Sequence, residues 1–487
     1  MSSKLQHLAE LEHVLTDKEK TSRGLLAFCT QFKVAQLFKP FDLVKSKGIR
    51  VSQLIFILCM GRLSGLSVWE MKKAGYHGFF TGDENTIYRL MNNPLMNWRK
   101  LLMSFAKQFK AITEANGELT TCVKAFILDD SDIIKTGKTF EFIGRIFNHV
   151  SHTYPLGFKI LTLGYWDGKS LIAADFSLHR EKGKSGKYGL SKKEQSNQFS
   201  KKRDKSAPSC KRIKELDEKK TEVAVSMIKR AVKNGLIAQY VLMDSWFTND
   251  YMIKAIRSIK NGALHVLGMC KIDKRQYDVN GKMLNSHQII TRNERKNSKY
   301  SSKHKSHYIT TVADYKGEKV KLFHIKYRNA KTWTLILTTN LTLKFTEAIE
   351  LYQIRWTIEV LFKECKQYLR LGSCQNTDFD GQIADATIAL MTHTIFTLQR
   401  RFEAYETMGE LFRETQQYLL ELTLWERILK VFIKMLQQLQ EILSIDIEET
   451  IQKIMSSNKS GSQLLAMLMA LDEDDDDNHT YKATCVV

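Results

Sequence analysis

Five polar or charged residues recur at helical spacing in LYQIRWTIEVLFKECK, the stretch that covers residues 351–366. They are Tyr352, Arg355, Glu359, Lys363 and Lys366. At about 100° per residue, these positions fall on one stripe of a helix roughly 80° wide. Apolar positions fall on the opposite side: Ile354, Ile358, Leu361, Cys365 and Leu369. The stretch therefore predicts a helix that packs by its apolar side and presents a Tyr-Arg-Glu-Lys row on the other.

This row has two interpretations. A solvated helix face held by i,i+4 ion pairs, such as Arg355 with Glu359 and Glu359 with Lys363, needs no further function. A single carboxylate among cations also suits a site in which the carboxylate binds a metal ion and the cations hold phosphate oxygens. Acidic residues elsewhere in the chain bear on the choice.

Two predicted strands end in acidic residues. FILDDSD (126–132) offers Asp129, Asp130 and Asp132, and AQYVLMD (238–244) ends at Asp244. Because side chains alternate along a strand, Asp129 faces away from Asp130 and Asp132. In an α/β sheet, ligands and metal ions collect where strands end. We expect an acid of the first strand to meet Asp244 and Glu359 through the fold.

Three converging carboxylates have a clear chemical use. Mg²⁺ prefers oxygen ligands and keeps several waters, so one or two carboxylates per ion suffice. Two such ions about 3.5–4 Å apart activate an attacking water or hydroxyl and stabilise the leaving 3′-oxygen in phosphodiester cleavage. The cations beside Glu359 would then hold the phosphates of the strand being cut.

At these residues the chain resembles the DDE transposases of bacterial insertion sequences, in the branch marked by Tyr-x2-Arg-x3-Glu-x6-Lys. Four positions match that signature, and two neighbours also look like members of the branch: Tyr352, Arg355, Glu359 and Lys366, with Trp356 and Lys363. ILDDSD resembles the family's first-Asp strand and VLMDSWFTND its second-Asp strand. The resemblance covers roughly residues 85–415.

The resemblance implies a catalytic triad of Asp130, Asp244 and Glu359 that binds two Mg²⁺ or Mn²⁺ ions. The family pattern, in which the Asp stands directly before Ser or Thr, favours Asp130 over Asp129, with Asp132 as an outsider. The DNA-binding residues implied by the same resemblance are Tyr352, Arg355, Lys363 and Lys366.

The implied reaction is cut-and-paste transposition. The enzyme would bind the insertion-sequence ends, cleave a phosphodiester bond at each end and join the freed 3′-OH ends to target DNA, working as a homodimer on DNA. Two alternatives stay open: an RNase H-like metal-dependent nuclease that cuts without joining, and a catalytically inactive DNA-binding derivative. The presence of all three acids argues against the inactive derivative.

The elements that must position these residues predict an α/β fold with an RNase H-like catalytic core. The first strand, near 122–134, is followed by strands near 157–166 and 169–179, joined by an Asp-Gly turn. We divide the chain into a helical N-terminal DNA-binding region (1–118), the first part of the core (119–268), a β-rich insertion (269–331), the second part of the core with the Glu359 helix (332–400) and a helical C-terminal region with the acidic tail (401–487).

Residues 180–220 form a basic segment with 15 Lys or Arg against 6 Asp or Glu. Such a composition, with several Ser and Gly, predicts a mobile loop that follows phosphate backbones, or a solvated linker.

The composition favours a soluble protein that binds nucleic acid. The 487 residues carry a formal charge of +21, which favours a polyanionic partner. No apolar run reaches the length of a membrane span, and the first residues lack the apolar core of a signal peptide. The eight Cys occur singly, which argues for a reducing cytoplasm and against a zinc site. We expect a bacterial cytoplasmic, nucleoid-associated protein that binds DNA and no membrane.

Overall fold

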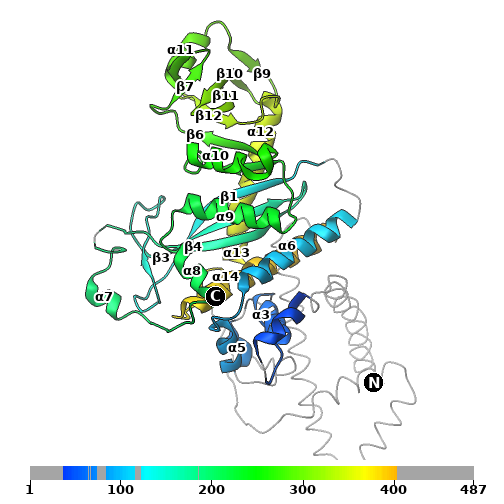
Figure 1. Ribbon diagram of the computed structural model, residues 1–487, viewed down its shortest axis with the longest axis vertical. Helices are drawn as coiled ribbons and strands as arrows, with labels where there is room; N and C mark the ends of the chain where they lie inside the picture. The colour runs from blue at the N-terminus through cyan, green and yellow to red at the C-terminus, as the bar shows by residue number, and fades with distance from the viewer. Residues whose placement is uncertain are drawn as a thin grey trace, which may run out of the picture.

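The computed structural model describes residues 37–402, except 46, 64, 66, 74–83, 116–121 and 185. The described part is elongated, with strands β7–β11 at one end, helices α3 and α5 at the other and the central sheet between them (Figure 1). The predicted C-terminal helical region, its acidic tail and the first third of the N-terminal region lie outside the described residues. The arrangement is an α/β fold with a large open mixed sheet, consistent with an RNase H-like core.

One continuous sheet of 12 strands runs through the described residues. The main path has the order β2-β3-β1-β5-β6-β12-β11-β10-β7-β8, with β4 paired to β3 and β9 paired to β10. The bounds of the strands are β1 Ala125–Ile134, β2 Gly144–Arg145, β3 Leu156–Trp166, β4 Leu171–His179, β5 Tyr240–Met243, β6 His265–Cys270, β7 Gln276–Val279, β8 Lys282–Asn285, β9 Lys299–Ser301, β10 Ser306–Tyr315, β11 Glu318–Tyr327 and β12 Thr334–Thr338.

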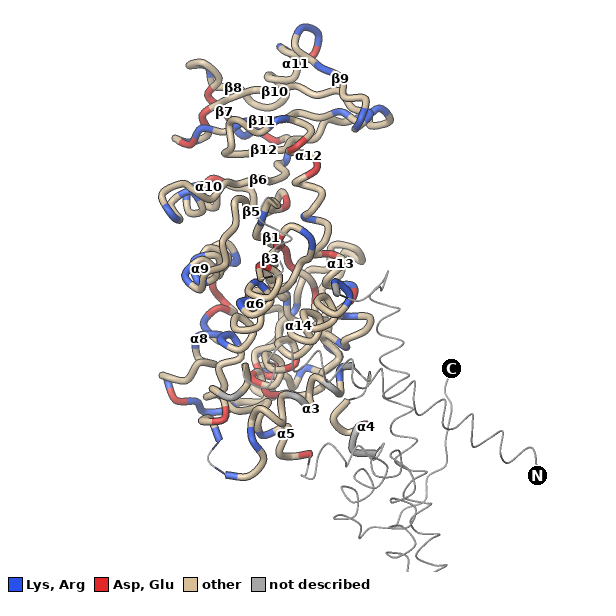
Figure 2. Tube along the Cα trace, turned by 90° about the vertical axis from the view of Figure 1, so that its right-hand side faces the viewer, with Lys and Arg blue, Asp and Glu red and all other residues tan. Residues whose placement is uncertain are grey.

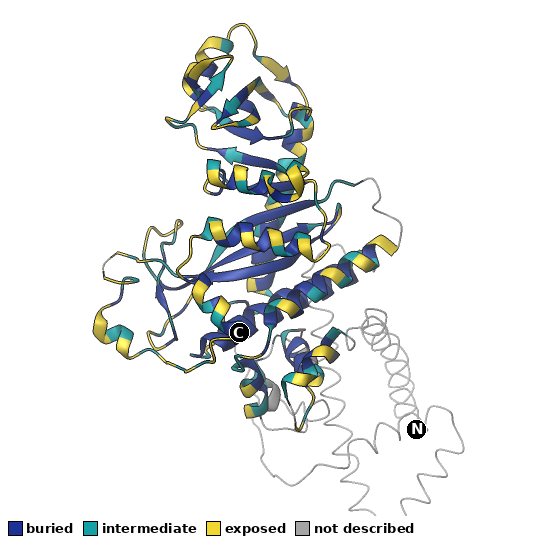
Figure 3. Cartoon of the chain, viewed as in Figure 1, coloured by how far each residue is buried: buried dark blue, intermediate teal, exposed yellow. Residues whose placement is uncertain are grey.

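Strand β1 lies at the centre of the functional part of the sheet. It pairs antiparallel with β3 and parallel with β5, and β5 pairs parallel with β6. The predicted hairpin of β3 and β4 is present, and Gly168 in its turn has φ 111°, which a glycine accepts without strain. These strands are apolar runs whose side chains are almost all buried (Figure 3), as expected of a sheet covered on both faces.

The strand-rich region after β6 continues the same sheet, because β12 pairs antiparallel with both β6 and β11. Strands β7–β11 and helix α11 (Ser286–Asn293) lie within it. The sequence predicts a β-rich insertion over 269–331, and the strands of this range share backbone hydrogen bonds with the core through β12.

Helices cover both faces of the central sheet. In Figure 2, α8, α9 and α10 lie on one side of it, and α13 and α14 lie on the other. The sequence predicts a short helix, a turn and a second basic helix over 83–105, and α5 and α6 form them. The bounds are η1 Lys39–Val44, α3 Val51–Leu63, α4 Val68–Lys73, α5 Glu84–Met91, α6 Trp98–Ala115, α7 Lys192–Ser196, α8 Pro208–Glu215, α9 Lys220–Lys233, α10 Asp250–Arg257, η3 Ile259–Gly262, α12 Phe345–Gln353, η4 Ile354–Trp356, α13 Thr357–Gln367 and α14 Phe379–Phe402.

Part of the basic segment 180–220 packs against the core, while many of its residues between 181 and 206 are exposed. It contains helices α7 and α8, and the side chain of Arg203 is only 3% exposed. The Arg203 guanidinium donates to Glu141 at 2.7 Å, to Asp380 at 3.0 Å and to Asp378 at 3.2 Å. We name these four residues the Arg203 cluster. Its three acids are buried, which explains why a strongly basic segment enters the interior.

Candidate active site

The two adjacent aspartates of β1 point to opposite faces of the sheet, as strand geometry requires. The Asp130 carboxylate accepts from Lys220 Nζ at 2.7 Å, and Lys220 begins α9. Ser131, which shares a face with Asp129, accepts at 2.8 Å from Lys366 Nζ of α13. Asp129 therefore faces α13, whereas Asp130 faces α9 across the sheet.

The predicted Tyr-Arg-Glu-Lys helix is present as three consecutive segments, α12, η4 and α13. The expectation of one continuous helix is wrong at 354–356, where the chain tightens into a 3-10 turn. The predicted apolar side of α13 is confirmed as buried: Ile358, Leu361, Cys365 and, just beyond the helix, Leu369. The helix is thereby held with Glu359 on its other side, where 37% of the side chain is exposed.

Arg355 joins the first strand to the Glu359 helix. Its Nη1 donates to Asp129 Oδ2 at 2.8 Å, and its Nη2 donates to Glu359 Oε1 at 2.7 Å. The Arg355 side chain is 12% exposed and that of Asp129 is 17% exposed, so the first of these ion pairs is largely desolvated. Two acids that are far apart in the sequence thus share one guanidinium.

Asp244 follows β5 at the same edge of the sheet. In the parallel pair of β1 and β5, Leu128 lies opposite Met243. Asp244, the first residue after β5, therefore lies beside Asp129 in the middle of β1, because neighbouring strands are about 4.8 Å apart. The Asp244 carboxylate accepts from the backbone N–H groups of Trp246 at 2.9 Å and Phe247 at 3.1 Å, which fixes its orientation in the turn before α10.

The electrostatics of Asp129 reflect this crowding. Burial raises the pKa of the Asp129 carboxyl from 3.8 to about 7, although Arg355 pulls the pKa down. The negative charges of Asp244 and Asp130 raise the pKa further. A buried carboxyl with carboxylate neighbours gains from a cation beside it, because the cation offsets both burial and like-charge repulsion.

The remaining residues of the row lie close by. Tyr352 is half-buried, its ring centroid is 5.8 Å from Arg355 Cζ, and burial raises the pKa of its hydroxyl to about 12. Lys363 and Lys366 are exposed on α13. The structure thus brings Tyr352, Arg355, Glu359 and Lys366 to the face of β1 that carries Asp129.

The carboxylate oxygens of these acids are the kind of ligand that a hard divalent ion prefers. Within the described ranges, no group of three His, Cys, Asp or Glu side chains is arranged to hold a metal ion, and Arg355 bridges Asp129 to Glu359. Asp129, Asp244 and Glu359 are the acids that could supply such ligands, although in this arrangement the Arg355 guanidinium stands between Asp129 and Glu359.

Residues outside this row have other surroundings. Trp246 is 50% exposed, and Lys220 Nζ lies 5.2 Å from its ring centroid, a contact that no sequence motif announced. The rings of His149 and His152 lie against the ring of Phe147. None of the six cysteines in the described part of the chain forms a disulfide.

Residues 217–395 match the family model of the transposase DDE domain. The match spans less than half of the chain and includes Asp244, Arg355 and Glu359, whereas β1 with Asp129 and Asp130 precedes it. No match to a curated protein was found. In the part of the chain that the structure describes, no helix is both long and apolar enough to cross a membrane. The domain match supports a DDE transposase, an enzyme whose partner is DNA.

Proposed function

We propose that this protein is a cut-and-paste transposase of the insertion-sequence type. It binds the ends of its mobile element, hydrolyses a phosphodiester bond at each end and joins the 3′-OH ends to target DNA. The observation that carries the proposal is that Arg355 bridges Asp129 to Glu359, while Asp244 directly follows the strand that pairs parallel with β1. The match to a transposase DDE domain over 217–395 supports it.

In this proposal the metal-binding acids are Asp129, Asp244 and Glu359, with Asp129 in the place that the family pattern assigns to Asp130. The reason is geometric: the Asp130 carboxylate is engaged by Lys220 on the opposite face of β1. Mg²⁺ or Mn²⁺ ions, two per site, would activate the attacking water or hydroxyl and stabilise the leaving oxygen.

The protein's own cations would hold the DNA. Lys363 and Lys366 lie along the exposed side of α13, where they can contact backbone phosphates, and the largely buried Arg355 lies just before the helix. Lys366 is anchored on Ser131, two residues from Asp129, so a phosphate bound by Lys366 would lie near the acids. Tyr352 packs beside Arg355 and would orient that guanidinium toward the strand.

The proposed enzyme works as a dimer in which each subunit cuts one end. The helical C-terminal region that the sequence offers for this contact lies outside the described residues. The mass of the protein–DNA complex in solution tests the dimer directly. A complex that contains both ends of the element but only one copy of the protein would contradict it.

The deciding experiment is metal-dependent nicking of a duplex that carries the ends of the encoding element. Asp129→Asn and Glu359→Gln should lose cleavage in Mg²⁺ and in Mn²⁺ while keeping DNA binding in EDTA. Asp130→Asn is the matched control, because it makes the same change one residue along and on the other face of the sheet; it should keep cleavage.

Two results would change the assignment. Cleavage that survives in Asp129→Asn but is abolished in Asp130→Asn would return the first acid to Asp130. Cleavage that survives in Glu359→Gln would mean that the Tyr-Arg-Glu-Lys row is a structural face. A second duplex in the reaction tests joining: cut ends that are never transferred to it would indicate a nuclease and contradict the transposase.

A further inference from the structure

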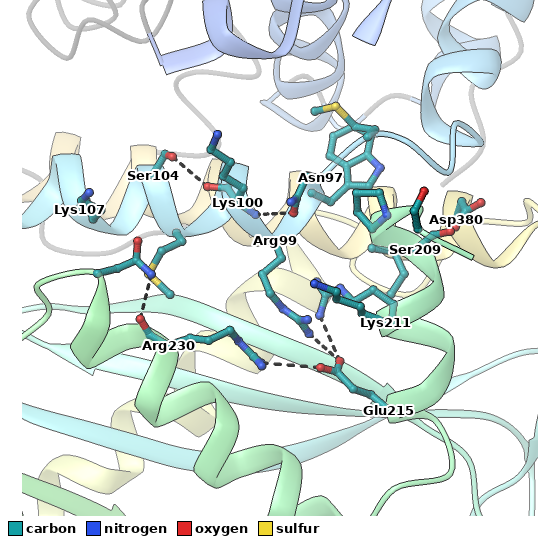
Figure 4. Close-up of a pocket in the computed structure, with 18 residues that line it drawn as sticks. Asn97, Arg99, Lys100, Ser104, Lys107, Ser209, Lys211, Glu215, Arg230 and Asp380 are labelled. Atoms are coloured by element: carbon teal, nitrogen blue, oxygen red, sulfur yellow. Dashed lines mark hydrogen bonds and ion pairs between the residues drawn. The ribbon is translucent and has the colours of Figure 1, made fainter. Parts of the chain in front are cut away.

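A cavity of about 540 Å³ lies on the α9 side of the sheet, among α6, α8, α9 and the start of α14 (Figure 4). None of Asp129, Asp244 and Glu359 lines it. Its lining includes six cations and two acids: Arg99, Lys100, Lys107, Lys211, Arg212 and Arg230, with Glu215 and Asp380. Since Asp380 is already paired within the Arg203 cluster, the wall is strongly positive.

The inner wall contains more buried positive charge than its acids neutralise. Arg99, Arg212 and Arg230 surround two acids, Asp175 and Glu215. Asp175 is fully buried and lies 3.0 Å from Arg99 and 2.8 Å from Arg230. Figure 4 shows the Arg99 and Arg230 side chains converging on Glu215 from α6 and α9. Three guanidinium groups against two carboxylates leave one buried positive charge without a counter-charge.

That charge is concentrated at Arg212. Arg212 is 4% exposed and lies beyond good pairing distance, at 3.9 Å, from both Asp175 and Glu215. Its Nη1 donates to the carbonyl oxygen of Phe176, but its Nη2 has no hydrogen-bond partner within the described part of the chain. Burial and the nearby Arg99 lower the pKa of Arg212 to about 9. A buried guanidinium in this state destabilises the fold unless an anion completes it.

A second donor lies beside it. The hydroxyl of Ser209 is also buried and without a partner in the described residues, and Ser209 lines the same cavity one turn before Arg212 on α8. Both atoms are buried within the wall and have almost no surface open to the cavity, so they reach the acceptor oxygens of a phosphate group only when the Arg212 and Ser209 side chains turn toward it.

The mouth of the cavity indicates where the phosphate comes from. Lys100, Lys107 and Lys211 line it and are exposed, and Lys100 and Lys107 are two turns apart on one side of α6. Exposed cations around the mouth can contact successive phosphates of a polyanion, whereas a free phosphate needs only the inner donors. The chain's formal charge of +21 is in keeping with a polyanion.

We propose that this cavity binds a backbone phosphate of DNA through Arg212 and Ser209, with the three lysines of the mouth contacting the neighbouring phosphates. The inference rests on the proposed function for the identity of the polyanion. Because the cavity is on the α9 side of the sheet and Glu359 is on the α13 side, the DNA held here is a segment other than the one being cut.

The test measures DNA binding without cleavage, in EDTA, by fluorescence anisotropy over a range of salt concentrations. The probe is a linear duplex of arbitrary sequence. The mouth variant is Lys100→Gln/Lys107→Gln/Lys211→Gln. It removes the three exposed positive charges at the mouth and leaves the buried wall unchanged, so the variant should fold. Its matched control is Lys282→Gln/Lys299→Gln/Lys319→Gln, which removes three exposed lysines from the distant strand-rich end.

We expect the mouth variant to bind DNA more weakly and to lower the slope of log K against log salt by about 0.9 for each phosphate that the protein no longer neutralises. The control should change the slope less. Arg212→Gln should weaken binding in the same way, provided its circular dichroism matches that of wild type. A parallel measurement follows the melting temperature in inorganic phosphate and in chloride at equal ionic strength; a rise in phosphate that Arg212→Gln removes supports the inner site.

Three results would overturn the inference. Stabilisation by phosphate with unchanged DNA binding in the mouth variant would make the site one for a free phosphate. No effect in either measurement would make the three arginines a structural network only. An equal weakening in the control would mean diffuse attraction to DNA. A wild-type protein that binds no DNA would instead contradict the proposed function itself.

Discussion

The raised pKa of Asp129 makes a quantitative prediction for protein stability. We expect the free energy of unfolding of wild type, measured in EDTA, to fall relative to that of Asp129→Asn as the pH rises. Below 3.8 the carboxyl is protonated in both the folded and the unfolded chain and contributes no difference. Above about pH 7 it is charged in both states, and the folded chain then carries the full penalty of a buried charge.

The size of the effect follows from the interval between the two pKa values. A rise from 3.8 to about 7 is about 3 units, which at about 1.4 kcal/mol per unit corresponds to about 4 kcal/mol as an upper limit. The assay is urea unfolding of wild type and Asp129→Asn between about pH 4 and pH 8, taking the difference at each pH so that other titrating groups cancel.

Mg²⁺ supplies the second half of the test. If the ion binds beside Asp129, it should restore stability to wild type near neutral pH and restore much less to Asp129→Asn. Asp130→Asn, which removes a carboxylate on the opposite face, should keep the stabilisation by Mg²⁺. A difference between wild type and Asp129→Asn that does not change with pH would refute the reasoning, because it would mean that Asp129 is solvated or fully compensated by Arg355.

Two further predictions concern the fold. Arg203→Met should destabilise the protein by about 3–5 kcal/mol in urea unfolding, because buried Glu141 loses its cation and only Lys201 remains to pair with Asp378 and Asp380; exposed Lys202→Met is the control, and an equal effect would contradict the cluster's role. Gly157→Ala should lower the melting temperature steeply, since its Cβ would collide with the carbonyl oxygen of Ile133 on the paired strand; an unchanged melting temperature would contradict the β1–β3 register.

The sequence predicts correctly which side of the Glu359 helix is buried, but it does not predict the break between α12 and α13. Apolar spacing identified the side that packs, since burial follows directly from the helical period. The 3-10 turn at 354–356 was not predicted, because the spacing of apolar residues does not indicate where an α-helix tightens locally into a 3-10 helix. At three residues per turn, this turn adds about 60° of rotation between Tyr352 and the start of α13.

The choice between Asp129 and Asp130 depends on tertiary packing. Strand alternation states only that they face opposite ways. The face that α13 covers is visible only from contacts such as Lys366 with Ser131, 235 residues apart, and our proposal of Asp129 rests on such contacts. The burial of Arg203 within segment 180–220 could not be predicted for a related reason: acids from distant parts of the chain meet its guanidinium there.

The parallel pairing of β1 with β5 has a consequence for synthesis of the chain. Ala125 pairs with Tyr240, which emerges from the ribosome 115 residues later (240 minus 125). At about 5–20 residues per second, the β5-facing edge of β1 stays unpaired for roughly 6 to 23 seconds. During that interval β3 and β4 can already pair beside β1, so the nascent chain presents a half-built sheet with an open apolar edge. Chaperone binding to the growing chain should therefore peak before Tyr240 is made and decline once β5 closes that edge.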